Sequence, residues 1–291
     1  MKKCLILSVA SVAIIAGSSC KHDAIVGRDT PTNNYATFGL SNKSNSQVLD
    51  SMGQWHNDYQ DSILTKITAS HIVLTDTVSI KQLISSTSKS FFLSKGIMFN
   101  EDFNRFNIGS NQLPLASRVN NFSSIALSIL NDLDATIKND DCQSSDFTGK
   151  LAVLKGRALL LTDQKEMITV GAAVSVAQHS FTYWNKNAAR WLSLLRSNNF
   201  SRTNMSTATI DLGPAPTPID SIDDANTGLA CKVNLNKVGG ADVGGAITGA
   251  TSGSIGGPAG AFAGGLVVAG VSSSYNIINQ ALTCKYSWWP W

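Results

Sequence analysis

A glycine-rich segment near the C-terminus constrains the fold of this chain more than any other feature. Residues 239–270 contain 12 glycines in 32 positions, about half of the 23 glycines in the whole chain. No Asp, Glu, Lys, Arg or His occurs from Val243 to Cys284, a span of 42 residues. In water, glycine weakens a helix by about 1 kcal/mol per residue relative to alanine. Helices in this segment therefore need a surrounding membrane or very close packing.

The glycines are spaced as they are in helices that pack closely within membranes. Two series run at steps of four, and they include Gly245, Gly249, Gly253 and Gly257, then Gly260 and Gly264. Residues four apart share one helix face, and glycines on that face allow two backbones to approach. Pro258 predicts a break into two arms, 241–256 and 259–271, each short for a complete membrane span. We predict a glycine-zipper hairpin over 239–291 that inserts into a membrane or forms a homo-oligomer.

Burial of the same two helices inside the chain's own fold remains open as an alternative. A flexible linker is disfavoured because apolar residues such as Ile247 and Phe262 alternate with the glycines. The chain closes with Trp288, Trp289 and Trp291. Aromatic residues beside a cation are typical of a membrane interface, although they would equally cover the end of a helical bundle.

The N-terminus predicts a secretory signal peptide over residues 1–19. Lys2 and Lys3 precede an apolar run, 5–16, that is too short for a membrane span of about 20 residues. The small residues before Cys20 resemble the signal of bacterial lipoproteins, although Gly17 stands where that family usually has Leu. The resemblance implies cleavage before Cys20 and attachment of a lipid such as palmitate to it. An ordinary cleaved leader is the alternative. Residues 20–44 are polar and predict a flexible tether.

Charge and cysteine content exclude several classes of function. Without Lys2 and Lys3 the chain has 21 Lys and Arg against 20 Asp and Glu, which gives no electrostatic basis for binding nucleic acid. Cys231 and Cys284 flank the glycine-rich segment, and a disulfide between them is possible in an oxidising compartment. Free thiols, with Cys142 as a third, are the alternative. No C-x-x-C pair or phosphate-binding loop is present, so we expect neither a metal nor a cofactor.

The middle of the chain predicts helices. Apolar residues recur every three or four positions over 48–67, 119–137 and 167–184. Asp163 is placed to cap the last of these helices, with Glu166 completing a capping-box-like pair. Shorter helices are expected over 79–94 and 149–161, and the single strand candidate is Ile72–Thr77. We predict an all-α fold with a helical bundle domain over 45–197, a Pro-rich polar linker over 198–238, and the hairpin.

Three short boxes carry a resemblance to a known group of proteins. They are Trp55-His56-Asn57, Ser180-Phe181-Thr182-Tyr183-Trp184 and Asp242-Val243-Gly244-Gly245-Ala246. In this order, behind a lipoprotein-like signal, they resemble uncharacterised lipoproteins of the Bacteroidota type. The glycine-rich tail is similar to those of class II bacteriocins and glycine-zipper membrane proteins. The resemblance implies a bacterial cell-envelope location, at the outer membrane, and carries no established activity.

These features together favour a non-enzymatic protein. We expect a lipid-anchored envelope protein whose glycine zipper inserts or self-associates in membrane lipid. The most specific form of this hypothesis is a bacteriocin-like role. The alternative is a periplasmic or surface binding lipoprotein, an adaptor with the glycine-rich helices buried. A hydrolase would combine Ser180, His56 and Asp58, but the chain has no G-x-S-x-G elbow.

Overall fold

The computed structural model describes residues 43–70, 77–97, 114–119, 121–139, 144–200, 233–254 and 257–286. These residues form seven α-helices and one 3-10 helix, with no strand in the described ranges, which confirms the predicted all-α fold class. The helices are α1 (Asn45–Ser70), α2 (Thr77–Ser94), η3 (Leu115–Arg118), α3 (Ser124–Asn139), α4 (Ser145–Leu159), α5 (Gln164–Phe200), α6 (Leu235–Gly253) and α7 (Gly257–Tyr286).

Several predicted features lie outside the described residues. They are the signal peptide, Cys20 and nearly all of the tether, residues 72–76 of the strand candidate, most of the linker, Cys142, Cys231, Trp288, Trp289 and Trp291. Thr77, the last residue of the strand candidate, is the first residue of α2. Cys284 belongs to α7, but its side chain is not among those described.

The predicted start of α5 is confirmed, with one difference. Asp163 Oδ1 accepts a hydrogen bond from the Glu166 N–H at 2.9 Å, as an N-cap does. The Glu166 carboxylate does not return to the cap, and instead accepts the N–H and the hydroxyl of Ser123. The Ser123 hydroxyl in turn accepts the N–H of Ala126 at the first turn of α3. One carboxylate therefore joins the starts of two helices.

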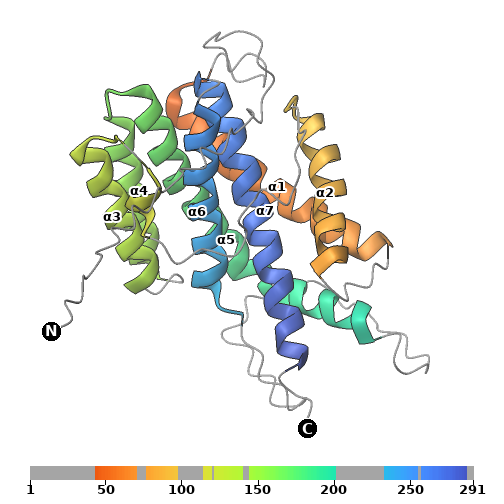
Figure 1. Ribbon diagram of the computed structural model, residues 1–291. Coiled ribbons are helices and arrows are strands. Elements are labelled where there is room, and N and C mark those ends of the chain that lie inside the picture. Colours follow the sequence, from red (N-terminus) through yellow and green to blue (C-terminus); the bar gives the residue numbers. More distant parts are fainter. Residues whose placement is uncertain are drawn as a thin grey trace, which may run out of the picture.

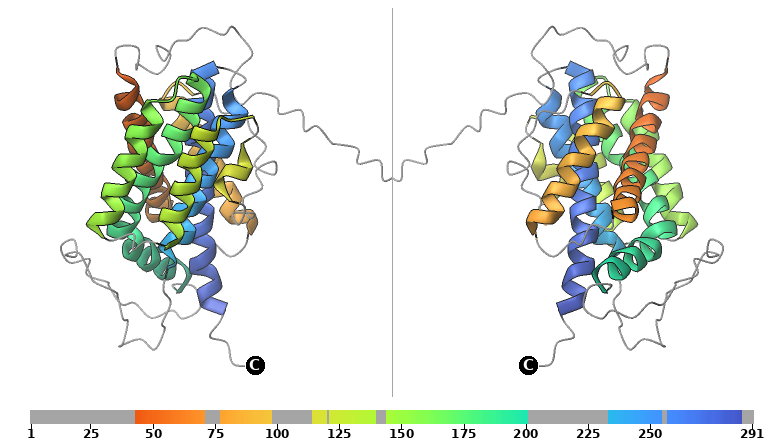
Figure 2. Two further views of the ribbon diagram at one scale, coloured as in Figure 1. Left: turned by 90° about the vertical axis from the view of Figure 1, so that its left-hand side faces the viewer. Right: turned by 90° about the vertical axis from the view of Figure 1, so that its right-hand side faces the viewer.

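The glycine-rich hairpin packs against α1 and α5 and is flanked by further helices on two sides. Figure 1 shows α6 and α7 side by side, between α3 and α4 on one side and α2 on the other, and the turned views of Figure 2 agree. Every residue of α7 from Gly260 to Ser274 is buried, so this helix is covered on all sides. The sequence predicts a hairpin that follows the bundle domain. In the structure it is part of the same packed unit as α1, α2 and α5.

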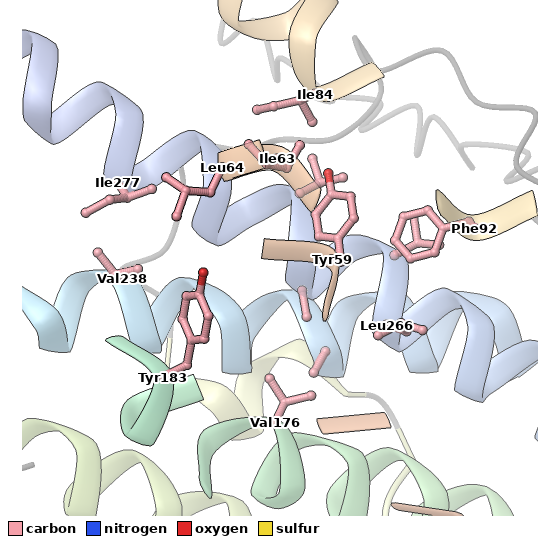
Figure 3. Close-up of a cluster of buried hydrophobic side chains, with 14 of the residues drawn as sticks. Tyr59, Ile63, Leu64, Ile84, Phe92, Val176, Tyr183, Val238, Leu266 and Ile277 are labelled. Atoms are coloured by element: carbon pink, nitrogen blue, oxygen red, sulfur yellow. The ribbon is translucent and has the colours of Figure 1, made fainter. Parts of the chain in front are cut away.

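Two large hydrophobic clusters hold the hairpin in place. The first joins α1, α2, α5, α6 and α7, and Figure 3 shows Tyr59, Phe92 and Leu266 among its members. The second joins α3 and α4 to α5 and α6 through residues such as Phe147 and Phe181, whose rings meet edge to face. The predicted apolar face of α1 is buried, with Val48, Met52, Tyr59, Ile63 and Ile67 all at most 2% exposed.

The turn between the two arms lies where Pro258 predicts it. α6 ends at Gly253 and α7 begins at Gly257, which has φ +75°, a conformation that favours glycine. Gly257 therefore serves the turn, and a Cβ there would meet no atom within 4 Å. The second arm is longer than expected, since α7 continues past Val271 to Tyr286.

Glycines bring the backbones of α6 and α7 into direct contact. A Cβ on Gly249 would lie 2.0 Å from the carbonyl oxygen of Gly264. A Cβ on Gly253 would lie 2.1 Å from the carbonyl oxygen of Gly260. Side chains at these positions would force the helices apart, because the atoms they meet belong to the backbone. Five of the six predicted zipper glycines line this contact, which lies within one chain: Gly245, Gly249, Gly253, Gly260 and Gly264.

Alanine substitutions at two helical glycines should have opposite effects on stability. We expect Gly249→Ala to lower the free energy of unfolding by about 2 kcal/mol, because its methyl group meets the Gly264 backbone. Gly149→Ala on α4 should raise it by about 0.5–1 kcal/mol, because the site is open and alanine favours helix. Urea unfolding measures both. A neutral Gly249→Ala would contradict the close contact.

Candidate functional site

A single buried carboxylate stands out within the hairpin. Asp242 is the only charged residue from Val238 to Cys284, and its side chain is fully buried. It lies on α6 one turn after Gly239, so the two residues share a helix face. At Gly239 a Cβ would lie 2.4 Å from the ring of Phe181 on α5. The absence of a side chain there lets α6 approach α5 closely enough for Asp242 to reach it.

Three side chains from two helices surround the Asp242 carboxylate. His56 Nε2, from α1, lies 2.7 Å from Oδ1. Trp184 Nε1, from α5, donates to Oδ2 at 2.9 Å, and the Ser180 hydroxyl donates to the same oxygen. Ser180 and Trp184 are four residues apart on α5 and so face the same way. All four residues are fully buried.

His56 carries a perturbed pKa. Burial by itself lowers the pKa of an imidazole, because it disfavours the charged form. The charge and hydrogen bond of Asp242, with a further hydrogen bond to Asn57 Oδ1 at 3.1 Å, outweigh burial and raise the pKa of His56. In its protonated form the ring donates from both nitrogens. We therefore treat His56 and Asp242 as a buried ion pair.

Gln60 forms hydrogen bonds with the second arm of the hairpin, α7. It lies one turn after His56 on α1 and donates to the Gly270 carbonyl at 3.1 Å and to the Ser273 hydroxyl at 2.7 Å. Its Oε1 accepts the hydroxyl of Ser274 at 2.7 Å. The α1 helix therefore binds α6 through an ion pair and α7 through a neutral amide. The serines that sequence analysis placed beyond the second arm are buried because α1 supplies their partner.

Polar contacts continue from His56 toward the surface. Asn57 Nδ2 donates to the carbonyl oxygen of His179 on α5 at 3.1 Å. The His179 ring lies 3.7 Å from Asp50, which also pairs with Lys155 of α4. Burial lowers the pKa of His179, and this outweighs the opposing effect of Asp50. The contacts therefore run from a half-buried ion pair to a fully buried one.

The geometry does not match a hydrolase. The Ser180 hydroxyl donates to Asp242, so His56 does not act as its base, which a serine nucleophile requires. Asp58, the third member of the hydrolase considered above, is 55% exposed and pairs with Lys95 at 3.4 Å. Within the described ranges, no cluster of His, Cys, Asp or Glu is arranged to hold a metal ion. The arrangement joins α1, α5 and α6 through one buried ion pair and its hydrogen bonds.

The structure brings together polar residues from all three boxes noted in the sequence. His56, Ser180 with Trp184, and Asp242 each come from a different box and meet at one carboxylate. The sequence patterns include Asp242 in the third box without a role for its carboxylate, and they do not indicate Gln60. The available signal was one Asp inside an otherwise uncharged, glycine-rich helix, because an unpaired charge there would be costly.

Comparison with family models, with curated proteins and with solved structures finds no match to this chain.

The stability conferred by His56 should depend on pH in a defined direction. Because folding raises the pKa of His56, its contribution is complete below the ordinary value of 6.5 and is lost as the pH rises through the raised value. At pH 6, His56→Gln should cost about 3 kcal/mol, since it leaves Asp242 without its counter-ion. Denaturant unfolding from pH 6 to 9 should show that the difference in free energy of unfolding between the wild-type chain and His56→Gln becomes smaller. A difference that grows with pH would contradict the ion pair.

Proposed function

We propose that the chain is a non-enzymatic, lipid-anchored protein of the bacterial cell envelope that stores a membrane-inserting hairpin inside a helical bundle. The observation that carries the proposal is the character of α7. Its stretch Gly257–Ala281, 25 residues, is long and apolar enough to cross a membrane, and 89% of the most apolar part is buried. A helix that is apolar on all sides suits either a protein core or a lipid bilayer.

The contacts within the hairpin are of a kind that lipid would preserve. α6 and α7 touch through glycine backbones, and helix association in lipid depends on such close packing. The contacts between the hairpin and the bundle are made by side chains, such as the Tyr59 ring against Gly270. The hairpin could therefore leave the bundle as one unit, with its internal contacts unchanged.

A lipid at Cys20 would hold the bundle close to its target. A tether keeps the local concentration of the hairpin near the bilayer high, which favours insertion without any new contact. Insertion would replace burial in protein by burial in lipid for the uncharged span 243–284. The remaining helices would stay in water.

A second candidate is a binding or adaptor lipoprotein in which the hairpin never leaves the bundle. The bonds from His56 to α6 and from Gln60 to α7 favour it, because they fix both arms to α1. Two open surface grooves offer room for a partner. One lies between α1 and α2 and has a volume of about 470 Å³; the other lies between α3 and α4 and has a volume of about 550 Å³.

Protease protection on vesicles separates the two candidates. The mature chain, residues 20–291, would be mixed with anionic phospholipid vesicles and digested with proteinase K. We expect a protected fragment covering 243–284 only when vesicles are present, identified by mass spectrometry. Gly249→Leu should reduce protection at least fivefold because it separates the arms, whereas Gly149→Leu at an open site should not. A soluble monomer that gains no protection would favour the adaptor.

The lipid anchor has its own test. In a bacterial host fed labelled palmitate, Cys20→Ser should abolish labelling and move the chain from the membrane fraction to the soluble fraction. Cys4→Ser should leave both unchanged, since Cys4 lies in the predicted leader. Labelling that survives Cys20→Ser would show that the lipid is attached elsewhere.

A further inference from the structure

We propose that the ionised carboxylate of Asp242 is a latch that holds the α6–α7 hairpin in the bundle, and that neutralising it releases the hairpin. The membrane step of this inference rests on the proposed function. The release step concerns the bundle in water alone and stands without it.

The latch acts first inside the bundle. Asp242 accepts hydrogen bonds from His56 on α1 and from Ser180 and Trp184 on α5, and all of these groups are fully buried. A buried charge is tolerated only while it is paired and hydrogen-bonded. Moving α6 away from α1 and α5 would strip the carboxylate of all three donors at once. The ionised form therefore opposes departure of the hairpin.

The same charge opposes entry into lipid. A carboxylate at the centre of a membrane helix costs roughly 2.5–3.5 kcal/mol on insertion scales, whereas a neutral side chain costs less. Asp242 is the only charged residue of the hairpin from Val238 to Cys284. Neutralising this one group thus weakens the hold of the bundle and lowers the barrier to the membrane. Both effects favour movement of the hairpin from the bundle into the membrane.

The groups around Asp242 determine what happens when its negative charge is lost. In the described part of the chain, the titratable group in contact with the carboxylate is His56 of α1, and the α5 groups Ser180 and Trp184 are neutral. From α7, Ser273 approaches His56 and is also neutral. The next charges lie farther out, at His179, Asp50 and Lys155. A neutral side chain in place of the Asp242 carboxylate would leave the His56 cation buried without its counter-ion, so loss of this one charge opens the latch.

Hydrogen exchange of the full mature chain in water tests the release step. Asp242→Asn should raise amide exchange in α6 and α7 at least tenfold at pH 7, with little change in α4. Ser180→Ala keeps the carboxylate and removes one hydrogen-bond donor, and it should raise the same amide exchange about threefold. This variant replaces the first one in the test if Asp242→Asn does not fold. Asp58→Asn removes an equal charge from an exposed site on α1 and should have no effect.

Vesicle protection of the wild-type chain and of Asp242→Asn tests the membrane step. At pH 7, protection of 243–284 should be higher in Asp242→Asn than in the wild-type chain. Wild-type exchange in Asp242→Asn would overturn the latch. If Asp242→Asn loosens the hairpin in water but neither protein inserts, the latch is supported and the membrane function fails.

Discussion

The contact between two glycine backbones, at Gly249 and Gly264, is the constraint on which the rest of the structure depends. It makes the hairpin narrow enough to be enclosed by helices on several sides. Because α6 and α7 present so little side-chain bulk to each other, their outer faces are free to pack on α1, α2 and α5. Glycine, which weakens an isolated helix, is favourable here because close packing more than offsets its poor propensity.

Polar contacts fix the relative positions of the helices in this apolar core. Hydrophobic packing alone allows helices to slide or rotate at modest cost, whereas a buried carboxylate accepts few positions. Asp242 fixes α6 against α1 and α5, and Gln60 fixes α7 against α1. Some aromatic rings pack directly against glycines, as the ring of Phe181 does at Gly239. A side chain in place of such a glycine would clash with the ring, so these contacts also fix how the helices are positioned.

Local patterns in the sequence predicted the helices well and their partners poorly. The apolar period of α1 and the position of Pro258 depend on nearby residues, and both agree with the structure. The pairing of His56 with Asp242 spans 186 positions, and no local pattern indicates which of several polar residues meet. The extent of α7 was underestimated for the same reason. The run Ser272–Ser274 is typical of a helix end unless a distant residue, here Gln60, supplies hydrogen bonds.

The order of the described helices along the chain has a consequence for folding during synthesis. The central helices, α6 and α7, are the last to be synthesised, and the helices that enclose them come first. Until residue 286 has emerged, α1 and α2 lack the apolar surface against which they pack, including Leu266 and Phe262. A chain that is still being translated therefore cannot complete its core. The compact state therefore forms only after the C-terminal helices have been synthesised.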